Sequence, residues 1–227
     1  MPGYVVATIK PWNIAAFQRH KGHAPDWHLI TDKGHLNPAT LKQIDPRYIF
    51  FPHWMWAVPS ELLDAYECVC FHETDVPFGR GGSPIQNLIA RGYTETKLVA
   101  LRMVKEIDAG PVYLKEPLDL QGSAQDVFDR TADMVYDMMD EIIRATPQPV
   151  PQAGEAILFS RRTPEMSELP KAASAAQIYD HIRMLDAETY PHAFIRHGEF
   201  VITFRNAQEQ DGIVKAVAEI RKAHASE

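Results

Sequence analysis

Cysteine is scarce in this chain, and the two cysteines lie close together in sequence. Cys68 and Cys70 are the only ones among the 227 residues. Residues two apart in a strand point the same way, with Cα atoms too far apart for an easy disulfide. The pair is therefore expected to remain as reduced thiols on a buried strand. A zinc site that adds His53 and His72 is the weaker alternative, because no second cysteine pair accompanies the first, and no bound metal is expected.

Long runs of apolar or of basic residues are also missing. No window approaches the roughly 18 apolar residues of a membrane-spanning helix, and the start of the chain lacks the basic and apolar regions of a secretory leader. Lysine and arginine total 23 against 30 acidic residues, which gives a net charge of −7. These absences predict a cytoplasmic protein with neither a membrane nor a nucleic acid as its main partner.

The common nucleotide-binding fingerprints are absent as well. The glycine-rich stretch from Gly79 to Ser83 lacks the G-x-x-x-x-G-K-[ST] pattern of a P-loop. The first apolar run ends in Thr8-Ile9-Lys10-Pro11-Trp12 instead of G-x-G-x-x-G, so a dinucleotide fold is not supported either. Considered alone, the glycine-rich stretch fits a turn before a helix starting near Pro84 and a binding loop equally well.

Apolar runs that alternate with helix-like segments are the main organising pattern. Strand-like runs occupy 4–9, 27–30, 47–51, 68–71 and 97–102, and helix-like segments occupy 11–20, 38–44, 59–66 and 83–91. The alternation predicts an α/β fold of the Rossmann-like kind, with a mostly parallel sheet covered by helices on both faces. Ser123 and Asp126 have the spacing of a capping box for the longest helix, which continues to just before Pro147.

A proline-rich connector at 146–152 divides the chain. We expect a first domain over 1–147 and a small α+β appendage over 148–227. The appendage is predicted to contain a strand at 157–159, a helix over about 174–186 capped by Ser174, and a strand at 199–205. The helical spacing of Ile213, Val217 and Ile220 predicts a packed terminal helix.

Three motifs, in order along the chain, resemble those of a known family. The first motif is Cys70-x-His72 with Thr74-Asp75-Val76-Pro77 and Arg80-Gly81-x-x-Pro84-Ile85-Gln86. The second motif is Val104-Lys105-Glu106-Ile107-Asp108-Ala109-Gly110. The third motif is Phe159-x-Arg161-Arg162-Thr163-Pro164-Glu165-x-Ser167 with Ile182-Arg183 and Tyr190-Pro191-x-Ala193-Phe194. The first two resemble the signatures of folate-dependent formyltransferases. The third is similar to the region after the catalytic domain in UDP-amino-sugar formyltransferases.

The resemblance implies a formyltransferase fold and transfer of one carbon from 10-formyltetrahydrofolate to a primary amine. The catalytic domain would be 1–147, and 148–227 would position the acceptor. His72 would take the proton that the amine loses, since imidazole titrates near neutral pH. Asp108 would orient that imidazole and stabilise its cation, or relay protons through water. Taken singly, His72 also fits a turn histidine and Asp108 an acidic turn former.

Cys70 stands where the family has asparagine. A carboxamide donates a firm hydrogen bond to a developing oxyanion, whereas a thiol is a weak donor. Either another group substitutes, with Thr74, Asn87, His53 and loop amides as candidates, or the reaction is slow or different. A covalent role for Cys70 is less favoured, because no nearby cation evidently lowers its pKa.

The resemblance also places the two substrates. The folate would lie against the aromatic run 50–59, the glycine-rich loop and the residues before Asp108, which gives as contacts His53, Trp54, Met55, Thr74, Gly82, Val104, Lys105, Glu106 and Ile107. A nucleotide-linked amino sugar would present its diphosphate to Arg161, Arg162 and Arg183, because guanidinium groups match phosphate oxygens. Surface salt bridges are the alternative role for these arginines.

Other acceptors give competing hypotheses. Methionyl-tRNA formyltransferases carry a larger C-terminal RNA-binding domain, which together with the net charge of −7 disfavours transfer RNA here. A hydroxyornithine or amino-acid amine, or water as in formyltetrahydrofolate hydrolases, would keep the fold and the donor. A catalytically silent protein that binds folate or a nucleotide is the non-enzymatic alternative. Apolar positions near the C-terminus permit a homodimer without requiring one.

Overall fold

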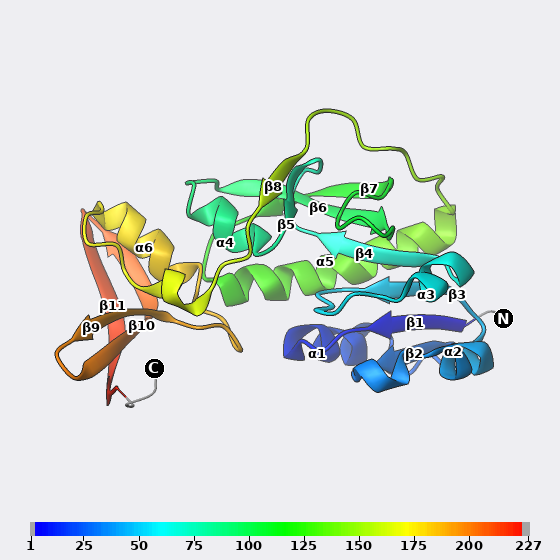
Figure 1. The fold of residues 1–227 in the computed structure, drawn as a ribbon, viewed down its shortest axis with the longest axis horizontal. Coiled ribbons are helices and arrows are strands. Elements are labelled where there is room, and N and C mark those ends of the chain that lie inside the picture. Colours follow the sequence, from blue (N-terminus) through cyan, green and yellow to red (C-terminus); the bar gives the residue numbers. More distant parts are fainter. Residues whose placement is uncertain (1–2, 224–227) are drawn as a thin grey trace. The chain divides into compact units, whose positions relative to one another are not determined.

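The structure, a computed structural model, describes residues 3–223 (Figure 1). The chain separates into two compact units built from alternating segments. The first comprises Met1–Gly81, Thr96–Leu118 and Phe128–Leu158, and the second comprises Gly82–Glu95, Asp119–Val127 and Phe159–Glu227. The functional domains expected at 1–147 and 148–227 stay a prediction. Within residues 3–223, no helix has the length and apolar character needed to cross a membrane.

A six-stranded sheet forms the centre of the first unit, in the order β2-β1-β3-β4-β6-β7. Its strands are β1 (Gly3–Ala7), β2 (Trp27–Ile30), β3 (Pro46–Phe51), β4 (Cys68–His72), β6 (Glu95–Arg102) and β7 (Val112–Asp119). Strands β1 to β4 run parallel, and β6 runs antiparallel to β4. The expected α/β fold with a mostly parallel sheet is therefore confirmed. Strand β7 was not foreseen from the sequence.

Apolar side chains on both faces of the strands explain this sheet. Val5 and Val6 of β1 are both fully buried, although neighbouring strand residues point to opposite faces. Ile49 and Phe50 repeat the pattern in β3. Cys68 is also buried in the hydrophobic core beside these strands. Such continuous apolar runs are typical of parallel strands that are covered on both sides.

Helices follow the strands of the first unit along the chain. They are α1 (Pro11–His20), the short 3₁₀ helix η1 (Lys33–His35), α2 (Pro38–Ile44), α3 (Ser60–Ala65) and most of α5 (Ala124–Ala145). The capping box expected for α5 is confirmed, since Ser123 N donates to Asp126 Oδ2 at 2.8 Å and Asp126 N donates to Ser123 Oγ at 3.2 Å. Helices α1 and α5 pack through Trp12 and Phe128, whose stacked ring centroids are 4.8 Å apart.

The second unit contains a three-stranded antiparallel sheet in the order β11-β10-β9. Its elements are α4 (Pro84–Ile89), η2 (Pro164–Ser167), α6 (Ala175–Arg183), β9 (Ala193–His197), β10 (Phe200–Gln210) and β11 (Ile213–Lys222). Helix α6 packs against β10 and β11 (Figure 1). Ser174 caps α6 through a capping box with Gln177. The expected α+β character of the C-terminal part is confirmed.

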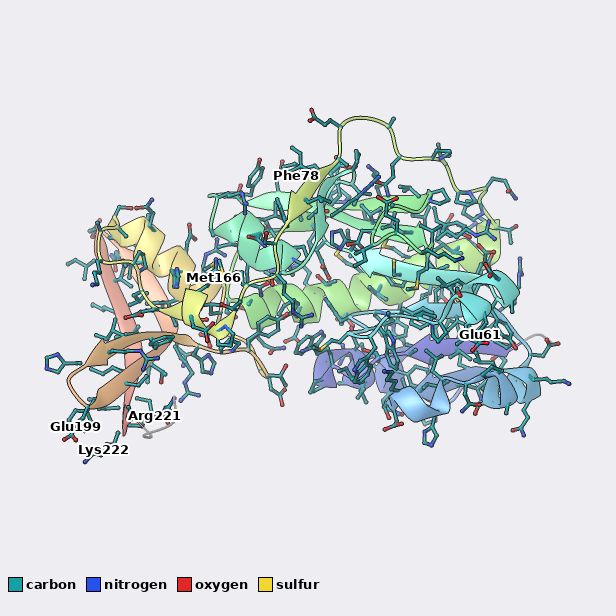
Figure 2. The ribbon with its side chains drawn as sticks, in the orientation of Figure 1. Glu61, Phe78, Met166, Glu199, Arg221 and Lys222 are labelled. Atoms are coloured by element: carbon teal, nitrogen blue, oxygen red, sulfur yellow. The ribbon has the colours of Figure 1, made fainter. Side chains whose placement is uncertain are left out.

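The terminal helix expected from Ile213, Val217 and Ile220 is wrong, because these residues belong to strand β11. Their β-branched side chains favour a strand. Asp211 and Gly212 adopt φ angles of 53° and 76° and close a tight hairpin between β10 and β11. At the other end of the hairpin, Glu199 Oε2 lies 2.9 Å from Lys222 Nζ (Figure 2).

Candidate active site

The two candidate catalytic side chains meet where β4 ends. His72 is the last residue of β4 and is only 6% exposed. Its Nε2 atom lies 2.8 Å from the carbonyl oxygen of Gly79, and its Nδ1 atom lies 3.6 Å from Oδ2 of Asp108. A carbonyl oxygen only accepts hydrogen bonds, so this geometry assigns the proton of the neutral imidazole to Nε2. The basic lone pair is then on Nδ1, beside a carboxylate.

Asp108 reaches His72 from the loop between β6 and β7. Its φ angle is 53°, in the left-handed region. Oδ2 of Asp108 accepts a hydrogen bond from the backbone N of Gly81 at 2.9 Å, so the oxygen that faces His72 is fixed by the glycine-rich loop. Gly110 is required in this turn, because a Cβ atom there would lie 1.7 Å from the carbonyl oxygen of Arg102.

The glycine-rich loop contributes strand β5 (Phe78–Gly81), which pairs with β8 (Ile157–Phe159). Gly79 and Gly81 have φ angles of 76° and 107°. Glycine adopts such angles without the steric cost that other residues carry. This backbone path turns the Gly79 carbonyl toward His72 and the Gly81 amide toward Asp108. Thr74, a proposed stand-in donor, already donates to the Gly79 oxygen at 3.3 Å.

Gln152 and Arg80 support the same site, and sequence reasoning assigned neither of them a role there. Nε2 of Gln152 donates to the carbonyl oxygens of Asp108 and Gly110 at 2.7 Å and 2.8 Å. Oε1 of Gln152 accepts from Nε and Nη2 of Arg80 at 3.0 Å and 2.8 Å. Arg80 lies inside the first motif, whereas Gln152 lies outside all three and carries no local signal of this role.

Cys70 lies on β4, two residues before His72. Burial raises the pKa of the Cys70 thiol above its ordinary range, and the Asp108 carboxylate raises it further. The thiol is therefore neutral near physiological pH. This disfavours a thiolate nucleophile and leaves Cys70 as a weak hydrogen-bond donor at the position where the motif resemblance led us to expect asparagine.

A second polar cluster surrounds His53, just after β3. Nε2 of His53 lies 2.6 Å from Oε1 of Glu73, whose residue is 3% exposed, and Nδ1 of His53 lies 2.9 Å from Nδ2 of Asn13. Burial by itself raises the pKa of Glu73, but the neighbouring His53 and, more weakly, His72 lower it overall. The carboxylate is thus charged inside the protein. Glu73 and Asn13 were missed from sequence, although a glutamate directly after the motif histidine was a visible signal.

The other residues expected to contact folate are distributed over several surfaces. Val104, Lys105 and Glu106 line an open groove of about 710 Å³ together with Leu63 and Asp64 of α3. Ile107 is 73% exposed and does not line this groove. Trp54 packs against the hydrophobic core, whereas Met55 is exposed. In the second unit, a Cβ atom on Gly82 would lie 2.7 Å from the Arg161 Cα atom, so the backbone there is tightly packed.

The three arginines expected to bind the acceptor differ in their contacts. Arg161 is exposed, and Arg162 donates to the carbonyl oxygen of Met166. Burial, and then the charge of Arg91, lowers the pKa of Arg162. Arg183 is 8% exposed and donates to three oxygens: Leu120 O at 2.6 Å, Gly122 O at 2.9 Å and Asp180 Oδ1 at 2.7 Å. The geometry thus favours a structural role for Arg183.

Asn87, the other proposed stand-in for the family asparagine, is also engaged. Its Nδ2 atom donates to the carbonyl oxygens of Gly82 and Ser160, both at 3.0 Å. Among residues 3–223, no group of three or more His, Cys, Asp or Glu side chains is placed to hold a metal ion.

Comparison with known proteins shows what this chain is similar to. The family model described as the methionyl-tRNA formyltransferase C-terminal domain matches residues 164–221. A methionyl-tRNA formyltransferase from Methylobacterium nodulans is 30% identical over 175 residues, which cover 69% of this chain and 56% of the relative. The chain therefore spans about half the length of the curated relatives it matches.

Two solved structures extend the comparison over nearly the whole chain. A methionyl-tRNA formyltransferase from Clostridium thermocellum is 41% identical, covers 98% of this chain and 100% of its own, and superposes with a TM-score of 0.94. A sugar N-formyltransferase from a Shewanella species is 15% identical and covers 96% of each chain with a TM-score of 0.65. The second likeness shows the fold alone.

Proposed function

This chain belongs to the folate-dependent formyltransferase family, and from that premise we propose that it transfers the formyl group of 10-formyltetrahydrofolate to a primary amine. The observation that carries the proposal is the pair of contacts on His72: Nε2 with the Gly79 carbonyl and Nδ1 with Asp108. They present a basic nitrogen beside a carboxylate at the end of a parallel strand. Proteins with parallel sheets commonly place their sites at such strand ends.

In this reaction, Nδ1 of His72 is the general base. The acceptor amine attacks the formyl carbon, the new C–N bond forms, and the carbonyl π electrons move onto the oxygen. Nδ1 of His72 takes the proton that the attacking nitrogen loses, and the Asp108 carboxylate stabilises the imidazolium. Collapse of the tetrahedral intermediate breaks the bond to N10 of the folate. N10 takes the proton from His72, which leaves tetrahydrofolate and the formylated amine.

The oxyanion of that intermediate receives limited help from Cys70. A neutral thiol is a weak donor, and loss of one good donor costs on the order of 100-fold or more in rate. The Gly81 amide, Thr74 and Asn87 each donate to other acceptors in this structure. We therefore expect chemistry that is slower than with asparagine at position 70.

The donor is proposed to bind in the groove beside residues 104–106. Val104, Lys105 and Glu106 in the groove lining belong to the loop that also carries Asp108, whose Oδ2 atom lies 3.6 Å from Nδ1 of His72. The glutamate tail of the folate is anionic, and Lys105 in the groove lining supplies a cation for it.

For the acceptor we propose a nucleotide-linked amino sugar. The exposed Arg161, next to Arg162, offers guanidinium groups for a diphosphate. The second candidate is the methionyl group of methionyl-tRNA, favoured by the name of the relative that is 41% identical. The net charge of −7 disfavours it, because binding of a polyanion relies on contacts between cations and phosphates.

The first test is calorimetric binding of the stable analogue 5-formyltetrahydrofolate. The wild type should bind, Lys105→Glu should bind about tenfold more weakly, and the matched control Lys42→Glu on α2 should bind like the wild type. Absence of binding to the wild type at about millimolar ligand would remove the formyltransferase proposal.

The second test identifies the acceptor. The enzyme and 10-formyltetrahydrofolate are incubated with UDP- or dTDP-linked amino sugars, with hydroxyornithine and with methionyl-tRNA, and formylated products are detected by mass spectrometry. Turnover of methionyl-tRNA alone would select the second candidate. Formate released without any amine would indicate a hydrolase, and tight folate binding without turnover would indicate a silent binding protein.

A further inference from the structure

The side chain of Gln152 uses its entire hydrogen-bonding capacity within the candidate site. Its amide group donates to the carbonyl oxygens of Asp108 and Gly110, and its oxygen accepts twice from Arg80. A glutamine has two amide hydrogens and two lone pairs on its oxygen, so four hydrogen bonds saturate it. A different orientation or position of the Gln152 amide would break some of these four hydrogen bonds.

These four bonds join three separate segments of the first unit. Gln152 lies in the connector after α5, Arg80 lies in β5, and Asp108 and Gly110 lie in the loop between β6 and β7. The loop is under conformational constraint, because Asp108 has a φ angle of 53°. Aspartate tolerates this region better than most residues, but the angle still carries a steric cost that contacts around the turn can offset. The two donors of Gln152 supply contacts of that kind.

Arg80 fixes which way the Gln152 amide points. The Arg80 side chain is 14% exposed, and its Nη1 atom lies 3.8 Å from Oε1 of Glu106. Guanidinium groups only donate and backbone carbonyls only accept. With the amide reversed, the NH₂ group would face the guanidinium and the oxygen would face two carbonyls, so all four bonds would be lost.

We propose that Gln152 is a positioning residue, oriented by Arg80, that holds the Asp108 carboxylate beside Nδ1 of His72. It touches no reacting atom and acts only through the turn that carries Asp108. Its effect on turnover rests on the proposed formyl transfer. Its effect on the geometry of His72 does not depend on that reaction.

Two substitutions test this role, because both remove the hydrogen bonds that Gln152 donates to the turn. Gln152→Met keeps most of the side-chain volume and removes all four hydrogen bonds, whereas Gln152→Glu keeps the acceptors for Arg80 and removes both donors to the turn. Each should lower kcat about 100-fold with KM values unchanged, since displacement of a reacting group by about 1 Å costs a factor of that size. The control Gln148→Met changes an exposed glutamine of the same connector and should match the wild type.

The Asp108→Asn background distinguishes positioning from a general structural role. If Gln152 acts through the carboxylate, Gln152→Met should lower kcat much less in Asp108→Asn than in the wild type. An equal factor in both backgrounds would overturn the proposal. Full activity of Gln152→Glu would overturn it as well, because that variant lacks the donors.

A readout without turnover separates failure of this proposal from failure of the proposed function. The ¹⁵N chemical shifts of the His72 imidazole report its tautomer and its neighbours, and Gln152→Met should change them in the direction that Asp108→Asn does. Unchanged shifts in a folded Gln152→Met protein overturn the positioning role even where no amine is formylated. If the Met variant does not fold, the same comparison is made with Gln152→Glu.

Discussion

Nδ1 of His72 lies 3.6 Å from Oδ2 of Asp108, and this oxygen also accepts a hydrogen bond from Gly81 N at 2.9 Å. The carboxylate is thus anchored by the glycine-rich loop and not by the imidazole. An anchored carboxylate does not need to move when the imidazole gains a proton. Preorganised charge of this kind stabilises a transient cation at little reorganisation cost.

Substitutions at His72 and Cys70 should differ strongly in their effect on kcat. His72→Ala removes the proposed base and should lower kcat by about 100-fold to 10,000-fold. Cys70→Ala removes only a weak donor and should cost about tenfold or less. Steady-state kinetics on the two variants, with thermal melts as a folding check, make the comparison. Equal losses would show that the thiol is essential.

The buried thiol of Cys68 should make the protein less stable in alkaline solution. Burial, followed by the charge of Glu67, raises the pKa of Cys68 from 9.0 to about 12. The unfolded chain therefore releases this proton first, so stability is full below pH 9.0 and falls as pH rises toward about 12. Between about pH 8 and about pH 10.5 this group alone should remove about 2 kcal/mol from the free energy of unfolding.

Urea denaturation at the two pH values measures this loss, and Cys68→Ala provides the comparison. The alanine variant should lose about 2 kcal/mol less than the wild type over the same interval. Identical losses in the two proteins would assign the alkaline transition to other groups, such as Tyr113 and Tyr136, whose pKa values burial also raises.

The local parts of the fold could be predicted because their signals lie within a few residues. Pro11 and Pro38 mark the starts of α1 and α2, and the Ser123–Asp126 capping box marks the start of α5. Strand β11 could not be recognised from its apolar spacing, since its exposed apolar residues give no period of two. The Asp211-Gly212 pair before it was the informative signal.

The candidate site was predictable only where a motif carried it. His72 and Asp108 follow from motif order and spacing, and the structure brings them together. Gln152 donates to the backbone of Asp108, which lies 44 residues earlier in the sequence. No local sequence pattern predicts a contact between residues so far apart. The buried environment that keeps Glu73 charged likewise depends on His53, which belongs to the loop after another strand.

The contact between Glu73 and His53 should make stability fall in acid. Burial alone would raise the pKa of Glu73, but His53 lowers it overall from 4.5, so the folded protein holds this carboxylate ionised at a pH where the unfolded chain binds a proton. The stabilisation is full above 4.5 and is lost as pH falls through the lowered pKa. Glu73→Gln should lower the free energy of unfolding by about 2 to 3 kcal/mol at neutral pH. The variant should also lose less stability than the wild type as the pH falls.

Urea titrations from neutral to acid pH compare Glu73→Gln with the wild type. Glu61→Gln, at the exposed start of α3 (Figure 2), is the matched control and should behave like the wild type. A Glu73→Gln protein with unchanged stability and an unchanged acid profile would show that the buried contact contributes nothing.

Gly110→Ala should lower both the free energy of unfolding and kcat. The added Cβ atom would meet the Arg102 carbonyl at 1.7 Å, so the turn must shift. Overpacking of this kind costs about 1 to 3 kcal/mol, and displacement of Asp108 should lower kcat about 100-fold. Gly212→Ala is the control, because Gly212 has a φ angle of 76° but no atom within 4 Å of the new Cβ. It should cost about 1 kcal/mol and leave kcat unchanged.

Substitution of Arg183 should affect mainly the stability of the protein, whereas substitution of Arg161 should affect mainly substrate binding. Arg183 is buried against Leu120 O, Gly122 O and Asp180, so Arg183→Lys should lose about 2 to 3 kcal/mol of stability without changing KM for a nucleotide sugar. Arg161 is exposed, so Arg161→Ala should leave stability within about 0.5 kcal/mol and raise that KM about tenfold. Chemical denaturation and acceptor kinetics on both variants test the pair. A KM raised about tenfold in an Arg183→Lys protein of unchanged stability would contradict the structural role and would support a contact between Arg183 and the phosphate groups of the acceptor.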